Sequence, residues 1–203
     1  FSDKKNYFYA SQDADEEYSN LTLKERLKAK RPFIDKILYT DFNCYAINSF
    51  FEASEILKEN KYKEIALKVL DFLIKNLVNK KGVTHYYDNE AHEPYLLKNQ
   101  LLLMNSLLKA NEEKHLKLAE ELMQKTINNF YDKEKNVFYD IKDLKENFGY
   151  LKIRRIDVED NSLAIKVFLN LYGKTKKSNY LEIADKTINS VKDYVDKNSI
   201  FSA

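Results

Sequence analysis

The sequence has few of the residues that make turns and cross-links. Its 203 residues include 3 Gly, 2 Pro, 1 Cys and no Trp. Tight turns and strand-rich folds depend on Gly and Pro, so their scarcity favours an all-α fold. The single cysteine, Cys44, excludes an internal disulfide, a C-x-x-C thiol pair and a cysteine-rich zinc site, and we expect a reducing, cytoplasmic setting.

An excess of one charge and long apolar runs are also missing. The 34 Lys and Arg nearly balance the 32 Asp and Glu, and no basic run carries interleaved aromatics. We therefore expect no nucleic-acid partner. No apolar run approaches the roughly 18 residues that a membrane-spanning helix needs, so we expect no membrane partner either.

The sequence does contain an internal repeat. Residues 47–53, Ile-Asn-Ser-Phe-Phe-Glu-Ala, return as residues 104–110, Met-Asn-Ser-Leu-Leu-Lys-Ala, and each copy precedes a second amphipathic segment. Such a repeat predicts tandem helical hairpins. We expect them at about 41–77, 97–130 and 160–195, each with a buried inner helix and a half-exposed outer helix, in a single domain of residues 1–203.

The connections between the hairpins hold the candidate ligand-binding residues. Residues 82–94 and 132–157 contain short β-like aromatic stretches, and such loops gather at one end of a helical array. Aromatic faces stack on sugar rings, and imidazole moves protons near neutral pH, so His85, Tyr87 and His92 are candidates for ligand binding. The alternative is a packed aromatic strand. The spacing of His85 and His92 matches no metal motif, and we expect neither a metal site nor a cofactor.

The candidate catalytic residues are the carboxylates Asp13, Asp15, Asp41 and Asp160, because glycoside hydrolysis needs two carboxyl groups about the scissile bond. Asp41 and Asp160 stand near the starts of inner helices and are expected to face one cleft. The simpler alternative is that each caps its helix. Asp13 and Asp15 lie two residues apart, on one side of an extended segment, where they either hold a sugar hydroxyl or form a solvated acidic loop. Buried Cys44 is expected to be part of the core rather than a nucleophile.

Four segments carry a resemblance to a known family. They are residues 11–15 (Ser-Gln-Asp-Ala-Asp), 31–36 (Arg-Pro-Phe-Ile-Asp-Lys), 39–43 (Tyr-Thr-Asp-Phe-Asn) and 85–88 (His-Tyr-Tyr-Asp). Together they resemble the C-terminal helical region of the thioredoxin-domain-containing family that includes spermatogenesis-associated thioredoxin-like proteins. The resemblance spans nearly the whole chain.

The resemblance implies part of an (α/α)6 toroid, similar to six-hairpin glycosidases and to N-acylglucosamine 2-epimerase. It also implies a thioredoxin-like domain upstream, in a longer polypeptide of which this chain is a C-terminal fragment. Three hairpins make about half of a six-hairpin ring, so we expect an arc. Gln100 and Asn161 are expected to bind ligand at its rim, although Asn99 and residues 159–162 depart from the pattern of the family's relatives.

Two functions remain open at this point. The first is a six-hairpin glycosidase-like domain with a carbohydrate or other small-molecule cleft at the inner-helix rim, resembling a glycosidase or a sugar epimerase if it is an enzyme. The second is a non-catalytic helical module that docks the upstream thioredoxin-like domain or another protein. An enzyme is expected to gather carboxylates and aromatics in a concave pocket, whereas a docking module is expected to expose an apolar patch.

Overall fold

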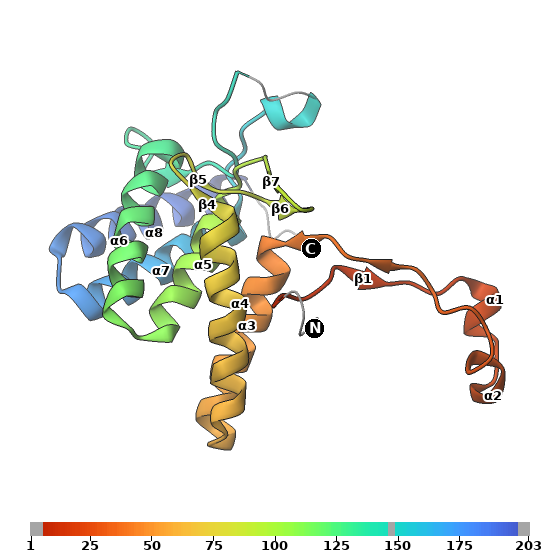
Figure 1. Cartoon of the computed structure of the whole chain (residues 1–203). Helices are drawn as coiled ribbons and strands as arrows, with labels where there is room; N and C mark the ends of the chain where they lie inside the picture. The colour runs from red at the N-terminus through yellow and green to blue at the C-terminus, as the bar shows by residue number, and fades with distance from the viewer. Residues whose placement is uncertain (1–5, 146–148, 199–203) are drawn as a thin grey trace.

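The computed structural model describes residues 6–145 and 149–198, with side chains up to Lys192. Three helical hairpins make up most of it (Figure 1). They are α3 (Thr40–Leu57) with α4 (Asn60–Leu77), α5 (Leu97–Ala110) with α6 (Glu113–Phe130), and α7 (Val158–Thr175) with α8 (Ser178–Asn198). Each inner helix ends at a residue in the left-handed conformation, Lys58, Asn111 or Lys176, which reverses the chain into the outer helix.

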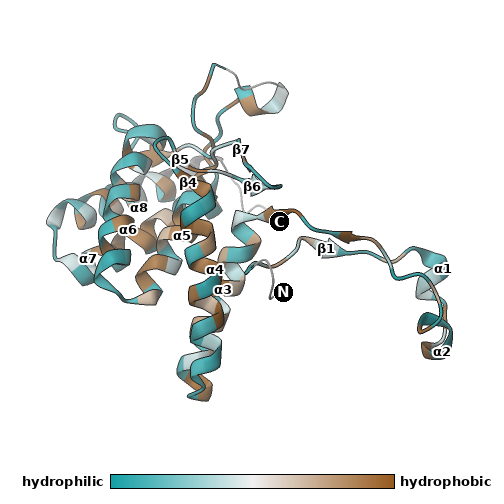
Figure 2. Cartoon of the chain, viewed as in Figure 1, coloured by the Kyte–Doolittle hydropathy of each residue, from teal (hydrophilic) through white to brown (hydrophobic). Residues whose placement is uncertain are grey.

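The inner helices α3, α5 and α7 lie side by side, and each outer helix packs on its own inner helix. Helix α5 lies between α3 and α7, and it is accordingly buried on nearly every side. The outer helices are amphipathic, with polar side chains on the surface and apolar ones turned inward (Figure 2). The expected alternation of buried and half-exposed helices is therefore confirmed. No helix in the described ranges is long and apolar enough to cross a membrane.

Short antiparallel strands fill the connections. After the outer helices come the hairpins of β4 (Val78–Asn79) with β5 (Gly82–Val83) and of β8 (Tyr131–Asp132) with β9 (Val137–Phe138). A small sheet joins β3 (Leu38–Tyr39), β6 (Tyr86–Tyr87) and β7 (Ala91–His92), with Tyr86 opposite both Tyr39 and His92. The aromatic stretches expected in the loops are thus strands that lead into the inner helices. A 3-10 turn, η1 (Gly149–Lys152), lies in the last connection.

One side-chain contact recurs at the start of every inner helix. Four residues after each N-cap stands an amide side chain, which grips the backbone N–H and C=O of a residue upstream. Asn43, Gln100 and Asn161 hold Phe8, Val83 and Phe138, respectively. In each case the upstream N–H donates to the amide oxygen at 2.8 Å. We call this contact the amide clamp.

The amide clamp of Gln100 also explains why residue 82, next to the clamped Val83, is a glycine. Gly82 has φ +138°, and a Cβ there would lie 2.8 Å from Gln100 Oε1, too close for any other residue. The second donor of each clamp amide goes to the carbonyl of its own N-cap residue, Tyr39, Leu96 or Asp157. Each clamp therefore ties an upstream segment to the start of its inner helix, and for Gln100 and Asn161 that segment is a strand, β5 or β9.

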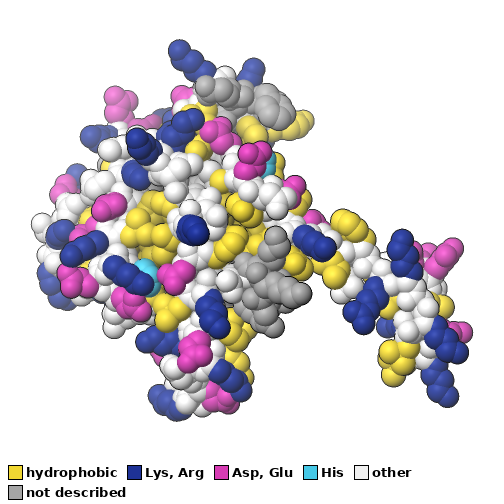
Figure 3. Space-filling model, viewed as in Figure 1, with side chains coloured by type: hydrophobic (Ala, Val, Ile, Leu, Met, Phe, Trp, Pro, Cys, Tyr) yellow, Lys and Arg dark blue, Asp and Glu magenta, His cyan; other side chains and the backbone are white. Residues whose placement is uncertain are grey.

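The chain between Phe8 and α3 forms an arm that projects from the bundle (Figure 1). Strand β1 (Ser11–Gln12) pairs with β2 (Ile34–Asp35), and the short helices α1 (Glu16–Ser19) and α2 (Leu23–Arg26) lie at the tip. Thr22 and Glu25 form a capping box at the start of α2. Leu23, Leu27 and Phe33 are 76%, 80% and 80% exposed, which leaves apolar side chains along the arm (Figure 3).

Candidate functional site

The N-terminal ends of the inner helices form one end of the array, which we call the rim. Counting from the N-caps Tyr39, Leu96 and Asp157 fixes the equivalent positions. Position two holds Asp41, Lys98 and Glu159, and position three holds Phe42, Asn99 and Asp160. Asp41 and Asp160 therefore both lie at the rim, but one residue out of register, so they point about 100° apart around their helices.

Capping does not explain Asp160. The N-cap of α7 is Asp157, whose Oδ1 accepts the Asp160 N–H at 2.9 Å. The Asp160 side chain is 8% exposed and makes no hydrogen bond with any described residue. At α3 the N-cap Tyr39 has no side-chain cap, and Thr40 donates its hydroxyl to the Thr84 carbonyl at 2.7 Å. Neither Asp160 nor Asp41 is therefore the N-cap residue that the capping alternative expects.

The surroundings of Asp160 make it a weak acid. Burial is the main cause and nearby Asp157 the next, and together they raise the pKa of Asp160 to about 6, although Lys98 opposes the shift. A carboxyl with such a pKa exchanges protons close to neutral pH, as an acid or base catalyst must.

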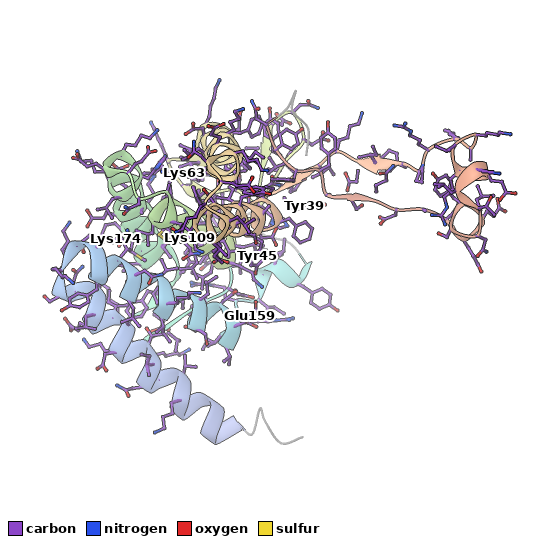
Figure 4. The ribbon with its side chains drawn as sticks, turned by 90° about the horizontal axis from the view of Figure 1, so that it is seen from below. Tyr39, Tyr45, Lys63, Lys109, Glu159 and Lys174 are labelled. Carbon is purple, nitrogen blue, oxygen red and sulfur yellow. The ribbon has the colours of Figure 1, made fainter. Side chains whose placement is uncertain are left out.

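Lys98 bridges two inner helices at the rim. Its Nζ lies 2.8 Å from Glu159 Oε1, and this contact is the main reason why the pKa of Lys98 is raised. Tyr45 and Asp160 also act on Lys98 electrostatically, so the ammonium lies among α3, α5 and α7. Figure 4 shows Tyr39, Tyr45 and Glu159 on one side of the view and Lys109 and Lys174 on the other.

His85 reaches the rim from the loop before α5. Its Nδ1 lies 3.1 Å from Asn99 Nδ2, and with the amide donating, the neutral imidazole carries its proton on Nε2. Burial lowers the pKa of His85, while Asp41 and the Asn99 contact partly oppose that effect. Asn99 is fully buried and its Oδ1 has no partner among the described residues. The rim therefore offers an imidazole that is neutral at pH 7, whereas the unpaired Asn99 oxygen is shielded from solvent.

Two aromatic side chains stand open beside these groups. Phe42 is 55% and Tyr45 is 45% exposed, and both belong to α3. Exposed aromatic faces next to polar groups suit a sugar ring, which presents C–H groups on its faces and hydroxyls at its edge.

Gln100 and Asn161 have a structural role. The Gln100 side chain donates its two N–H groups to the carbonyls of Val83 and Leu96. The Asn161 side chain donates its two N–H groups to the carbonyls of Phe138 and Asp157. Neither amide has a donor left for a ligand. These two side chains shape the rim by holding the strands before it.

Tyr87 and His92 match the packed-strand alternative. The Tyr87 ring packs against Phe72 at 5.4 Å and Tyr7 at 6.4 Å, toward the outer helix α4. The His92 ring stacks on Tyr86 at 4.6 Å. Of the three candidates in this loop, only His85 reaches an inner helix.

Asp13 and Asp15 belong to the segment between β1 and α1, and this segment lies on the arm, away from the inner helices (Figure 1). Asp13 accepts the Ser11 hydroxyl at 2.9 Å, and Asp15 caps α1 by accepting the Tyr18 N–H at 2.7 Å. The structure does not bring these two carboxylates to Asp41 and Asp160. Within the described residues, no group of three or more His, Cys, Asp and Glu side chains is arranged to hold a metal ion.

Lys98, Tyr45 and the contact of Asn99 with His85 were missed in the sequence. Once the clamp amides are known, counting two residues back from each of them places Asp41, Lys98 and Glu159 on one level. Cys44 is fully buried as expected, and burial raises the pKa of its thiol, which makes it a poor nucleophile.

No protein-family model and no curated protein matches the chain. Solved structures match it at low identity. A family 76 glycoside hydrolase (mannosidase) from Bacteroides thetaiotaomicron is 18% identical over 77% of this chain and 44% of that chain, with a TM-score of 0.67. Cellobiose 2-epimerase from Spirochaeta thermophila is 16% identical over 75% and 42%, with a TM-score of 0.63. A D-mannose isomerase is 12% identical over 74% and 40%, with a TM-score of 0.62.

These similarities show the fold. The matched structures are (α/α)6 toroid enzymes, and this chain is an all-α array of hairpins that forms part of such a toroid. The chain spans less than half the length of the structures it matches. The six-hairpin glycosidase-like fold expected from the sequence is confirmed, whereas the relation to the thioredoxin-domain-containing family gains no support.

Proposed function

We propose that the rim binds a carbohydrate and that Asp160 is its acid–base group. The observation that carries this proposal is the Asp160 carboxyl, which is nearly buried, has no hydrogen-bond partner among the described residues and has a pKa raised to about 6. Keeping such a group costs stability, and proteins keep such groups mainly at functional sites. The names of the matched structures, a mannosidase and a cellobiose 2-epimerase, support a sugar as the ligand.

The remaining rim groups fit this chemistry. A sugar ring stacked on Tyr45 or Phe42 would direct hydroxyls toward the Lys98 ammonium. Protonated Asp160 would then donate to a sugar oxygen. Hydrolysis needs a second carboxyl group, and the other carboxyl groups at the rim are those of Asp41 and Glu159. Epimerisation needs a group that removes a proton and returns it, and His85 is also available for this role.

A non-catalytic docking module is the second candidate. The exposed Leu23, Leu27 and Phe33 of the arm favour it, since apolar side chains exposed together mark protein contacts. The upstream thioredoxin-like domain remains a predicted partner for this role, and the cytoplasmic setting remains a prediction from the single cysteine.

The experiment is a binding screen followed by NMR. The chain is titrated with mannose oligosaccharides and with cellobiose while amide resonances are recorded, and the same is done for Asp160→Asn and for the control Asp185→Asn, a substitution at an exposed position of α8. We expect saturable shifts at the starts of α3, α5 and α7, retained in Asp185→Asn and altered in Asp160→Asn. Shifts confined to the arm, or no shifts with any sugar, would refute the carbohydrate site.

A further inference from the structure

A second polar pocket lies on the inner helices, beyond the rim toward their C-terminal ends. Its volume is about 640 Å³, and besides Asn111, which follows α5, its polar lining comprises Glu55, Asn105, Lys109, Lys166, Asn170 and Lys174. These side chains come from α3, α5 and α7, so the pocket lies across the array of inner helices. The rim residues do not line it.

Asn105 is the least expected member of the lining. It is 7% exposed, and its amide has no hydrogen bond with any described residue. Its amide lines the pocket and is free to bond a partner there. Its equivalent in the first hairpin, Asn48, accepts the Ser106 hydroxyl at 3.3 Å. Asn105 therefore lacks the neighbour that its repeat partner has.

Two of the lysines have local explanations. Lys109 forms an ion pair with Glu52, and Lys174 donates to Asn111 Oδ1 at 2.6 Å. Both stand in the last turn of their helices, where a positive charge offsets the negative end of the helix dipole. Neither side chain requires a ligand.

Lys166 has no such explanation. It stands nine residues before the end of α7 at Thr175, too far to interact with the helix terminus. It makes no hydrogen bond or ion pair with any described residue, although its charge helps to lower the pKa of Glu52 after the larger effect of Lys109. Lys109, Lys166 and Lys174 carry three positive charges, whereas Glu52 and Glu55 carry two negative charges. One positive charge is therefore not balanced.

We propose that this pocket binds a small oxyanion, a phosphate group in free or ester form, with Lys166 supplying the charge and Asn105 the amide donor. Gly173 leaves space for it, because no atom lies within 4 Å of where its Cβ would be. Asn105 and Lys166 lie six positions beyond Asn99 and Asp160, or about 9 Å along the helices. The site is thus separate from the rim, and it does not depend on the proposed carbohydrate site.

Inorganic phosphate is the first probe. The chain is titrated with phosphate at constant ionic strength, with chloride as the balancing salt, and amide resonances are followed by NMR. Lys166→Gln removes the charge at an exposed position, and Lys166→Arg restores it. Asn105→Asp places a carboxylate in the pocket with almost no change of shape. Lys63→Gln is the matched control, since Lys63 is an exposed lysine of the outer helix α4 (Figure 4).

We expect saturable shifts in the C-terminal halves of α5 and α7. Lys166→Gln is expected to weaken phosphate binding about tenfold, Asn105→Asp at least as much, and Lys63→Gln not at all, while Lys166→Arg keeps most of the affinity. Glycerol phosphate separates the two forms of the ligand, because tighter binding than phosphate indicates an ester. Shifts that never saturate, or that are equal in Lys166→Gln and Lys63→Gln, would show general ion effects and overturn the proposal.

Discussion

Replacing Asp160 by Asn is expected to make the protein more stable at neutral pH. The folded state raises the pKa of this carboxyl from 3.8 to about 6. Between these values the folded state binds more protons than the unfolded state, so the carboxyl lowers stability as the pH rises through this window. A shift of about 2 units corresponds to about 3 kcal/mol, which water at the open edge of the rim screens to about 1–2 kcal/mol.

The assay is urea unfolding of the wild type and of Asp160→Asn from pH 4 to pH 8. We expect the two proteins to be equally stable near pH 4, and the variant to exceed the wild type by about 1–2 kcal/mol above pH 6. Asp185→Asn, at an exposed position of α8, is the control and is expected to change stability by less than about 0.5 kcal/mol. A variant that is less stable than the wild type at pH 7, or a difference that does not change with pH, would refute the reasoning.

Three further substitutions test other parts of the structure. Asn161→Ala leaves the backbone of Phe138 without its clamp and is expected to cost about 2–4 kcal/mol in urea unfolding, against less than about 0.5 for neighbouring Ser162→Ala. Gly173→Ala meets no atom within 4 Å and is expected to add about 0.5–1 kcal/mol of thermal stability, which a loss of stability would contradict. Burial lowers the pKa of His115, so the free energy of unfolding falls as the pH drops below about 6.5. The substitution His115→Leu is expected to reduce that loss between pH 7 and pH 5. If the variant kept the pH profile of the wild type, this explanation would be wrong.

The helices were predictable because their signal is local. In α6 the apolar residues recur on one face, and α5 is apolar all round, so periodicity alone separates an outer helix from an inner one. The capping box at Thr22 was predictable for the same reason, since both partners lie within four residues. The hairpins then pack against one another because this packing buries their apolar faces.

The clamp and the arm were not predictable, because their partners are distant in the sequence. Asn43 and Phe8 are 35 residues apart, and Asn161 and Phe138 are 23 apart. Nothing near an Asn in the first turn of a helix shows whether its amide faces a ligand or an upstream strand. The pairing of β1 with β2, which carries Asp13 and Asp15 away from the rim, is likewise set by residues more than 20 positions apart.

The register of the rim residues depends on a single residue step. Asp41 and Asp160 looked equivalent in the sequence because each stands near the start of an inner helix. The clamp amides fix the true correspondence, in which Asp160 replaces Asn99 and Phe42. A step of one residue turns a side chain by about 100° on a helix, so an error of this size changes which groups face one another.

The repeat separates the residues that hold the fold from those that carry chemistry. Position four after the N-cap is an amide in all three hairpins and always clamps the backbone of an upstream residue, whereas position three is an aromatic, an amide and a carboxyl in turn. Neighbouring positions face different surroundings, so the two roles can be changed independently. Asn161→Ala is therefore expected to lower stability at every pH, whereas the effect of Asp160→Asn depends on pH; the reverse pattern would mean that the carboxyl, and not the amide, holds the start of α7 in place.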